Sequence, residues 1–148
     1  MSMQKSTSIT FLVVIFLLLT ACSAGSQKSQ TPSAKSPAAA DLELAAVVEE
    51  VVQKHEAVDE VVAVVLNKHI STAFKVSGFH RLRLKQIRRE VNDLIQEAVP
   101  SEYTVHITTD KRLIRDLKKV ARDIKANDGI ALPQTQDELE KINKDMHG

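Results

Sequence analysis

Histidine side chains are the first groups of this sequence to test for metal binding or catalysis. The five histidines stand at His55, His69, His80, His106 and His147. No two of them have the His-x-x-x-His or His-Glu-x-x-His spacing that places two ligands on one helical face. Because a zinc site needs three or four convergent ligands, the sequence predicts no metal site. We expect these histidines to be solvated or half-buried.

Other catalytic groups show no recognisable spacing either. The chain has only four glycines, and it lacks the Gly-x-Ser-x-Gly turn of hydrolases and the glycine-rich loop that holds phosphates. Nothing in the sequence places two carboxylates in one pocket for general acid–base catalysis. We therefore expect no enzymatic activity and no non-covalent cofactor. The 20 basic residues nearly balance the 19 acidic ones, and tryptophan is absent, so we expect no nucleic-acid partner.

The only cysteine, Cys22, follows a short apolar segment, Phe11–Leu19, which is preceded by a positive charge at Lys5. A charged start, an apolar centre and small residues are typical of a secretory signal peptide, predicted here as residues 1–21. About ten apolar residues span roughly 15 Å as a helix, which is half the hydrocarbon thickness of a bilayer. The segment therefore does not predict a permanent transmembrane helix.

The sequence Leu19-Thr20-Ala21-Cys22 resembles the lipobox of bacterial lipoproteins. The resemblance implies a covalent diacylglyceryl group on the Cys22 sulfur and cleavage before Cys22. It also implies a cell-membrane location on the extracytoplasmic side. Two or more acyl chains hold a protein stably at a bilayer. Acylation of Cys22 would exclude disulfides and thiol catalysis. The alternative is an ordinary cleavage after Ser23, which would release a soluble protein.

Composition divides the remaining chain into three parts. Residues 22–40 are rich in Ser, Ala, Gln and Pro and have no acidic residue, which predicts a flexible membrane tether. Residues 41–126 show periodic apolar patterns and are predicted to form one small domain. The tail, residues 127–148, contains Pro133 and a weak apolar pattern. A short docked helix and a frayed end both fit that tail.

The first half of the predicted domain contains one helix and two strands. Asp41 is a suitable N-cap for a helix with the apolar residues Leu44, Val47, Val48 and Val51. Val58–Leu66 is short and rich in valine, which predicts an inner strand. Asn67-Lys68 forms a two-residue gap before the alternating segment His69–Val76, and this spacing predicts a hairpin.

The second half contains two helices and one strand. Apolar residues at helical spacing, from Leu84 to Ala98, predict a helix that ends before Pro100. Tyr103–Thr108 is predicted as the third strand, and Thr109 or Asp110 as the cap of a helix that stops near Gly129. The predicted order is α-β-β-α-β-α. Three strands do not form a core alone, so we expect an α+β fold with at least the first two helices on one sheet face.

Positive charges gather in the second and third predicted helices. The segment from Arg81 to Arg89 has five basic residues and no acid, whereas Asp41 to Glu60 has seven acids and one lysine. If the two basic faces are neighbours, they form one patch for an anionic partner, either lipid head groups or an acidic protein surface. The alternative is ordinary solvated helix faces. The candidate binding residues are Arg81, Arg83, Arg88, Arg89, Lys118, Lys119 and Arg122.

Three segments carry a resemblance to a known family. They are the hairpin VVAVVLNKHISTAFKV, the helix end IQEAVP and VHITTDKRLIRDLKKVARDI. Together with the lipobox, they resemble the YhcN/YlaJ sporulation lipoproteins of spore-forming Gram-positive bacteria, over roughly residues 42–125. The strand and helix order is also similar to BON and ring-building domains of bacterial envelope assemblies, at the level of fold alone.

The family resemblance implies a lipoprotein on a membrane of the developing spore, with a part in germination. It supplies no catalytic residues. We therefore expect a lipid-anchored, non-enzymatic interaction component of the spore envelope, which binds other envelope proteins or a second copy of itself. There are two alternatives. One is an accessory hydrolase that acts on the spore wall, which a pocket with two facing carboxylates would favour. The other is a structural assembly subunit.

Overall fold

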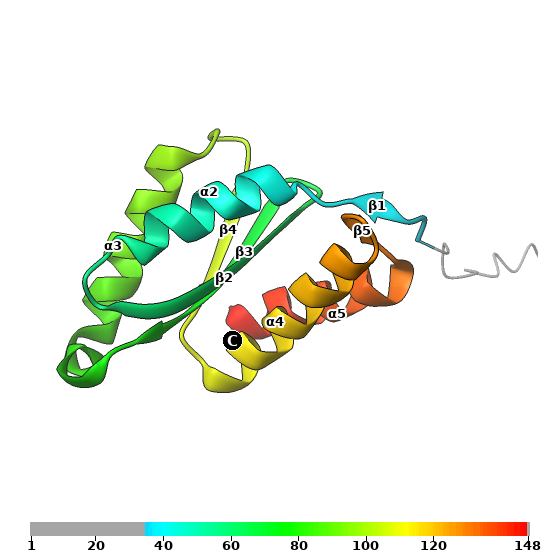
Figure 1. Cartoon of the computed structure of the whole chain (residues 1–148). Coiled ribbons are helices and arrows are strands. Elements are labelled where there is room, and N and C mark those ends of the chain that lie inside the picture. Colours follow the sequence, from blue (N-terminus) through cyan, green and yellow to red (C-terminus); the bar gives the residue numbers. More distant parts are fainter. Residues whose placement is uncertain (1–34, 148) are drawn as a thin grey trace, which may run out of the picture. The chain divides into compact units, whose positions relative to one another are not determined.

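The computed structural model describes residues 35–147 (Figure 1). The lipobox, Cys22 and the signal peptide lie outside these residues. Within them the elements are β1 (Ala38–Ala39), α2 (Leu42–Gln53), β2 (Val58–Leu66), β3 (His69–Val76), the 3₁₀-helix η1 (Gly78–Arg83), α3 (Leu84–Ala98), β4 (Thr104–Thr108), α4 (Lys111–Ala126), β5 (Ile130–Ala131) and α5 (Pro133–Met146). The predicted α-β-β-α-β-α order and the α+β class are confirmed.

The main sheet has the strand order β2-β3-β4. β2 and β3 are antiparallel and joined at Asn67 and Lys68, which have φ values of 49° and 62°. Positive φ at both turn residues matches the right-handed twist of a two-residue hairpin, so the predicted hairpin is confirmed. β4 runs parallel to β3, and Ile70 lies opposite Val105. The parallel direction is possible because α3 returns the chain to the end of the sheet at which β3 begins.

One face of the sheet is covered by α2 and α3 (Figure 1). Val48 and Val52 of α2 and Val91 and Ile95 of α3 are fully buried against Phe74 of β3. The expectation that the first two helices share a face is therefore confirmed. Within α3 the buried line is Ile87, Val91 and Ile95, at steps of four. Leu94, which the apolar pattern includes, is only half-buried at the side of that line.

The opposite face is covered by α4 and α5. Leu117 and Val120 of α4 pack with Leu139, Ile142 and Met146 of α5 in a second core. The side chain of Asp110 caps α4 by accepting hydrogen bonds from the backbone N–H groups of Arg112 and Leu113. These bonds hold the pKa of the Asp110 carboxyl below its usual value, and the bond from Leu113 has the larger effect. Because Leu139, Ile142 and Met146 are buried in the second core, the C-terminal segment forms a docked helix and not a frayed end.

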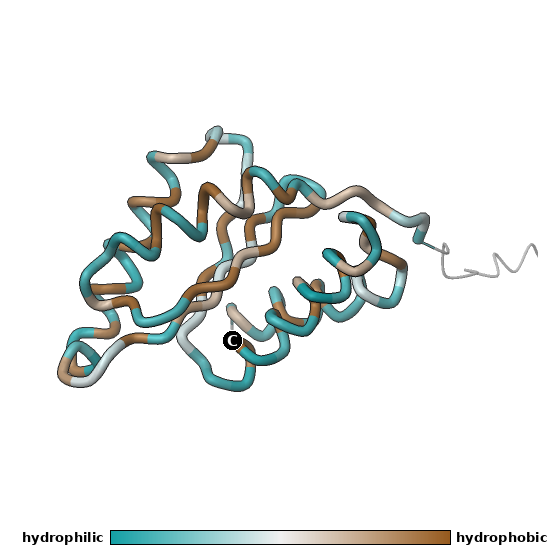
Figure 2. Tube along the Cα trace, viewed as in Figure 1, coloured by the Kyte–Doolittle hydropathy of each residue, from teal (hydrophilic) through white to brown (hydrophobic). Residues whose placement is uncertain are grey.

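The prediction that β2 is an inner strand is wrong, because β3 is the central strand. β2 is nevertheless buried on both faces along Val62–Leu66, with Ala63 and Val65 in the first core and Val62, Val64 and Leu66 in the second. The brown course of this strand in Figure 2 follows that two-sided burial. A continuous apolar run therefore indicates that a strand is buried on both faces, and it does not show that the strand is central in the sheet.

The domain also begins before Asp41. β1 pairs with β5 in a small antiparallel sheet, and the Gln136 side chain donates a 2.7 Å hydrogen bond to the Ser36 carbonyl. Lys35 forms ion pairs of 2.8 and 2.7 Å with Asp137 and Glu140 of α5. Residues 35–40, assigned from composition to the tether, are therefore part of the folded unit. A chain that begins at Ala34 keeps every contact described here.

Candidate functional site: a basic groove at the sheet edge

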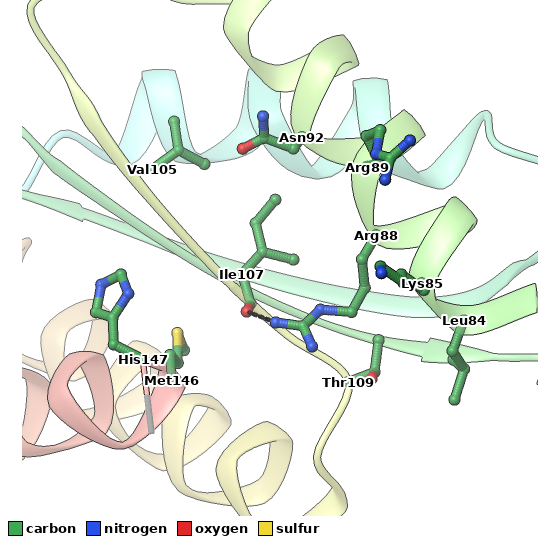
Figure 3. Close-up of a pocket in the computed structure, with 10 residues that line it drawn as sticks. All are labelled: Leu84, Lys85, Arg88, Arg89, Asn92, Val105, Ile107, Thr109, Met146 and His147. Carbon is green, nitrogen blue, oxygen red and sulfur yellow. Dashed lines mark hydrogen bonds between the residues drawn. The ribbon is translucent and has the colours of Figure 1, made fainter.

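An open groove of about 630 Å³ lies between α3, the edge strand β4 and the end of α5 (Figure 3). Its α3 wall carries Lys85, Arg88 and Arg89, and its floor is formed by Val105 and Ile107 of β4. The remaining lining residues are Leu84, Asn92, Thr109, Met146 and His147. The groove thus combines an apolar floor with three cations, and no carboxylate of residues 35–147 lines it.

The backbone of β4 presents to this groove polar groups that do not pair with β3. The Thr104 N–H donates to the Lys68 carbonyl, which lies next to β3. In a strand, alternate residues direct their N–H and C=O groups to the same side. Those of Val105 and Ile107 therefore point away from β3. The Arg88 guanidinium donates a 3.2 Å hydrogen bond to the Ile107 carbonyl, as Figure 3 shows, which confirms that this carbonyl faces the groove.

The cations of η1 and α3 have no acidic partner within 4 Å among residues 35–147. These residues are Arg81, Arg83, Lys85, Arg88 and Arg89, and all five are exposed. The Arg81 and Arg83 side chains donate instead to the Val76 carbonyl and to Gln86. A concentration of unpaired positive charge is therefore present on this helix and the turn before it.

The predicted basic patch does not form as one surface. Arg88 and Arg89 lie on the face covered by α2 and α3, whereas α4 lies on the opposite face of the sheet. The two candidate lysines of α4, Lys118 and Lys119, are also already paired. Lys118 binds Glu60 of β2, and Lys119 binds Glu138 at 2.8 Å and Asp123 at 3.3 Å. The hydrogen bonds that the Lys119 ammonium donates, first to Glu138 and then to Asp123, raise the pKa of Lys119.

The α4 contribution to an anion site is therefore small. Arg122 is exposed on α4, away from the groove. The two sets of cations could have formed one surface only if α3 and α4 were adjacent on the same side of the sheet. The first half of the predicted set, Arg81 to Arg89, remains as the candidate binding region.

Three histidines form a chain that sequence reasoning missed. Nδ1 of His69 lies 3.0 Å from Nε2 of His106, and Nδ1 of His106 lies 2.6 Å from Nε2 of His147. The chain links β3, β4 and the end of α5. The three residues are separated by 37 and 41 positions, so only the strand register and the docking of α5 bring them together. No local sequence signal could have found them.

The histidine chain does not converge on one point. The two ring nitrogens of His106 face two different neighbours, whereas metal ligands must direct their nitrogens at a common centre. Within residues 35–147, no group of three His, Cys, Asp or Glu side chains has an arrangement that could hold a metal ion. We therefore interpret the chain as a structural contact between the sheet and α5.

We expect this contact to weaken in acid. Burial of His106, and then the neighbouring His147 and His69, lower its pKa from 6.5 to about 4. Between pH 6.5 and pH 4 the unfolded chain therefore binds a proton at His106 that the folded chain does not bind. The stability that the neutral His106 contributes is complete above pH 6.5 and is lost as the pH falls towards 4. The expected loss is about 3 kcal/mol in the free energy of unfolding.

Urea unfolding at pH 7.0 and pH 4.5 measures this loss. His106→Gln should reduce the difference in unfolding free energy between the two pH values, whereas His80→Gln, in η1, should leave it unchanged. Both variants keep every carboxylate of the chain, including that of Glu140, which lines the same cavity as His69 and His106. An equal pH dependence in the wild type and His106→Gln would contradict the assignment.

The carboxylates between α4 and α5 line a second cavity of about 200 Å³. Asp145 pairs with Arg112 at 3.0 Å, Glu138 pairs with Lys119, and Asp116 pairs with Arg115 at 3.3 Å. Each carboxylate of this cavity thus has a cationic partner. This arrangement differs from the two facing, unneutralised carboxylates that an acid–base pair needs.

Comparison with known protein families places this chain among them by sequence. Residues 23–147 match the family described as sporulation lipoprotein YhcN/YlaJ. This range extends past the predicted resemblance at both ends and includes β1, β5 and α5. No curated protein and no solved structure matches the chain, so the likeness to BON and ring-building domains stays a prediction. In residues 35–147 no helix has the length and apolar character required to cross a bilayer. Since the match covers most of the chain, the protein belongs to the YhcN/YlaJ family of sporulation lipoproteins.

Proposed function

We propose that this sporulation lipoprotein is a non-enzymatic interaction component of the spore envelope that contributes to germination. A lipid on Cys22 would hold it on the extracytoplasmic side of a spore membrane, and the groove beside β4 would bind an acidic segment of another envelope protein. The observation that carries the proposal is the combination, in one groove, of the outer edge of β4 with Lys85, Arg88 and Arg89, which have no ion-pair partner among residues 35–147.

The strand edge determines the form of the bound segment. An extended peptide can add to an exposed edge through backbone hydrogen bonds, and neighbouring side chains then supply specificity. The outward groups of Val105 and Ile107 are available for such bonds. An incoming N–H would replace the Arg88 guanidinium at the Ile107 carbonyl. The guanidinium would then be free to bind a carboxylate of the same peptide.

The charges determine the kind of partner. Pairing of two β4 edges from two copies would bring two sets of these cations together, and like charges repel at that distance. An acidic segment has the complementary charge. We therefore propose a different, acidic protein as the occupant of the groove and not a second copy of this chain.

Charge reversal on α3 tests this function. A seven-residue peptide of alternating Glu and Val is the probe, and fluorescence anisotropy at low salt measures its binding to the chain from Ala34 to Gly148. We expect Arg88→Glu with Arg89→Glu to weaken binding at least about tenfold, because each reversal replaces an attraction with a repulsion. The fold should be retained, since exposed charges contribute little to stability.

The control is Arg122→Glu with Lys125→Glu on α4, which makes the same change in net charge on the opposite face. This variant should bind the peptide like the wild type. Equal weakening by both pairs would show only a general charge effect. Absence of wild-type binding at low salt would likewise reject the groove as the site. Val105→Pro removes one outward N–H, which an edge strand tolerates, and should also weaken binding if the peptide adds as a strand.

A further inference from the structure

The turn η1 exposes two large apolar side chains almost completely. Phe79 is 94% exposed and Leu82 is 90% exposed. The other large apolar residues exposed in residues 35–147 are Leu42, Val47, Ile130 and Leu132, at 37% to 43%. Each of these four is thus more than half covered. Phe79 and Leu82 therefore stand apart as apolar groups that the fold leaves in water.

The geometry of η1 places both side chains on one side. In a 3₁₀-helix the residues i and i+3 are eclipsed, so Phe79 and Leu82 project together. The next positions of the turn, His80 and Arg83, form an adjacent line by the same spacing. Gly78, with φ of +29°, turns the chain out of β3 into this helix. η1, green in Figure 1, lies at one end of the folded unit, and β1 lies towards the other end.

Positive charges are neighbours of the apolar pair in the chain. Arg81 and Arg83 belong to the same turn and have no ion-pair partner among the described residues, and Lys85 follows in the first turn of α3. Apolar side chains beside unpaired cations form the composition that binds the interface of an anionic bilayer. The apolar groups enter the acyl boundary, and the cations stay with the phosphates.

We propose that the η1 tip, Gly78–Arg83, inserts Phe79 and Leu82 into an anionic membrane surface. It would provide a second membrane contact that is separate from the lipid and from the groove. Membership in a lipoprotein family suggests that a membrane is near the domain. A protein partner fits less well, because a stable protein interface buries about 1,200 Å² or more and two side chains supply only a small part of it. A second copy would bring like charges together.

Vesicle binding of the chain from Ala34 to Gly148, which contains neither Cys22 nor the signal peptide, tests the proposal. We expect the wild type to co-sediment at low salt with vesicles that contain phosphatidylglycerol, and much less with vesicles of phosphatidylcholine alone. Phe79→Ser with Leu82→Ser should reduce the partition coefficient on the order of tenfold. The melting temperature should be unchanged, because both side chains are already in water. Val47→Ser with Leu132→Ser is the matched control and should bind like the wild type.

A tryptophan at the tip gives an independent measurement. The chain has no tryptophan, so Phe79→Trp introduces a single tryptophan, whose emission can be excited separately from that of Tyr103. Its emission should shift to the blue with anionic vesicles and should be quenched by brominated acyl chains. Gln96→Trp, exposed towards the other end of α3, should show neither effect. An unshifted emission of the Phe79→Trp variant, or equal vesicle binding by the double serine variant and the wild type, would overturn the proposal. Because no peptide is present, these outcomes do not depend on the groove.

Discussion

Cys22→Ala is expected to remove the lipid label from the protein and to abolish its stable attachment to the membrane fraction. The reason is the position of the only cysteine, directly after Leu19-Thr20-Ala21 and the apolar segment Phe11–Leu19. Each buried CH₂ of an acyl chain contributes about 0.8 kcal/mol to membrane binding, so the loss of two chains outweighs any surface contact of the domain. Where the altered signal is not cleaved, the precursor should accumulate unprocessed.

Metabolic labelling with palmitate, followed by fractionation of sporulating cells, measures this effect. Ser23→Ala is the matched control, because it changes the next residue and keeps the sulfur. It should be labelled and fractionate like the wild type. An unlabelled wild-type protein that is nevertheless found at the membrane would reject lipidation of Cys22. The η1 tip or the uncleaved signal would then have to account for attachment.

Leu139→Ala is expected to lower the free energy of unfolding by about 2–5 kcal/mol, the usual cost of removing a buried leucine side chain. Leu139 is 3% exposed and packs with Leu117, Val120 and Ile142 in the second core. A small domain has a total stability of about 5–15 kcal/mol, so this loss is a large part of it. The result would show that the C-terminal helix is integral to the domain.

Urea unfolding at pH 7, followed by circular dichroism, measures this change. Leu132→Ala, just before α5, is the control, because Leu132 is 43% exposed. Its effect should remain within about 0.5 kcal/mol. If Leu139→Ala is equally mild, α5 does not cover the sheet in solution. The histidine chain through His147 would then also be lost, and the acid sensitivity assigned to His106 should be absent.

The lipid, the η1 tip and the groove make separable contributions in these proposals. Cys22 would determine whether the protein stays at the membrane, and Phe79 with Leu82 would orient the domain on the bilayer surface. The groove would then select the acidic partner. Each part has its own variant and its own readout, so the failure of one proposal leaves the others testable.

Local structure could be predicted from the sequence by itself, because neighbouring residues determine it. Period-two alternation and the Asn67-Lys68 pair predicted the hairpin, and Asp41 and Asp110 predicted helix starts that the structure confirms. The apolar stripe from Leu84 to Ala98 predicted α3, although the buried line runs through Ile87, Val91 and Ile95. A stripe shows which side is apolar, and the exact direction of packing depends on the neighbours.

Long-range arrangement was decided only by the tertiary structure. The weak pattern of Leu139 and Ile142 became a buried helix because α4 leaves part of the second sheet face uncovered, and residues 35–40 joined the fold because β5 offers them a strand. The basic patch divided because α3 and α4 cover opposite faces. His69, His106 and His147 met because β4 is parallel to β3 and α5 ends beside it. Which face a helix covers depends on contacts between residues far apart in the chain, and local periodicity contains no information about those contacts.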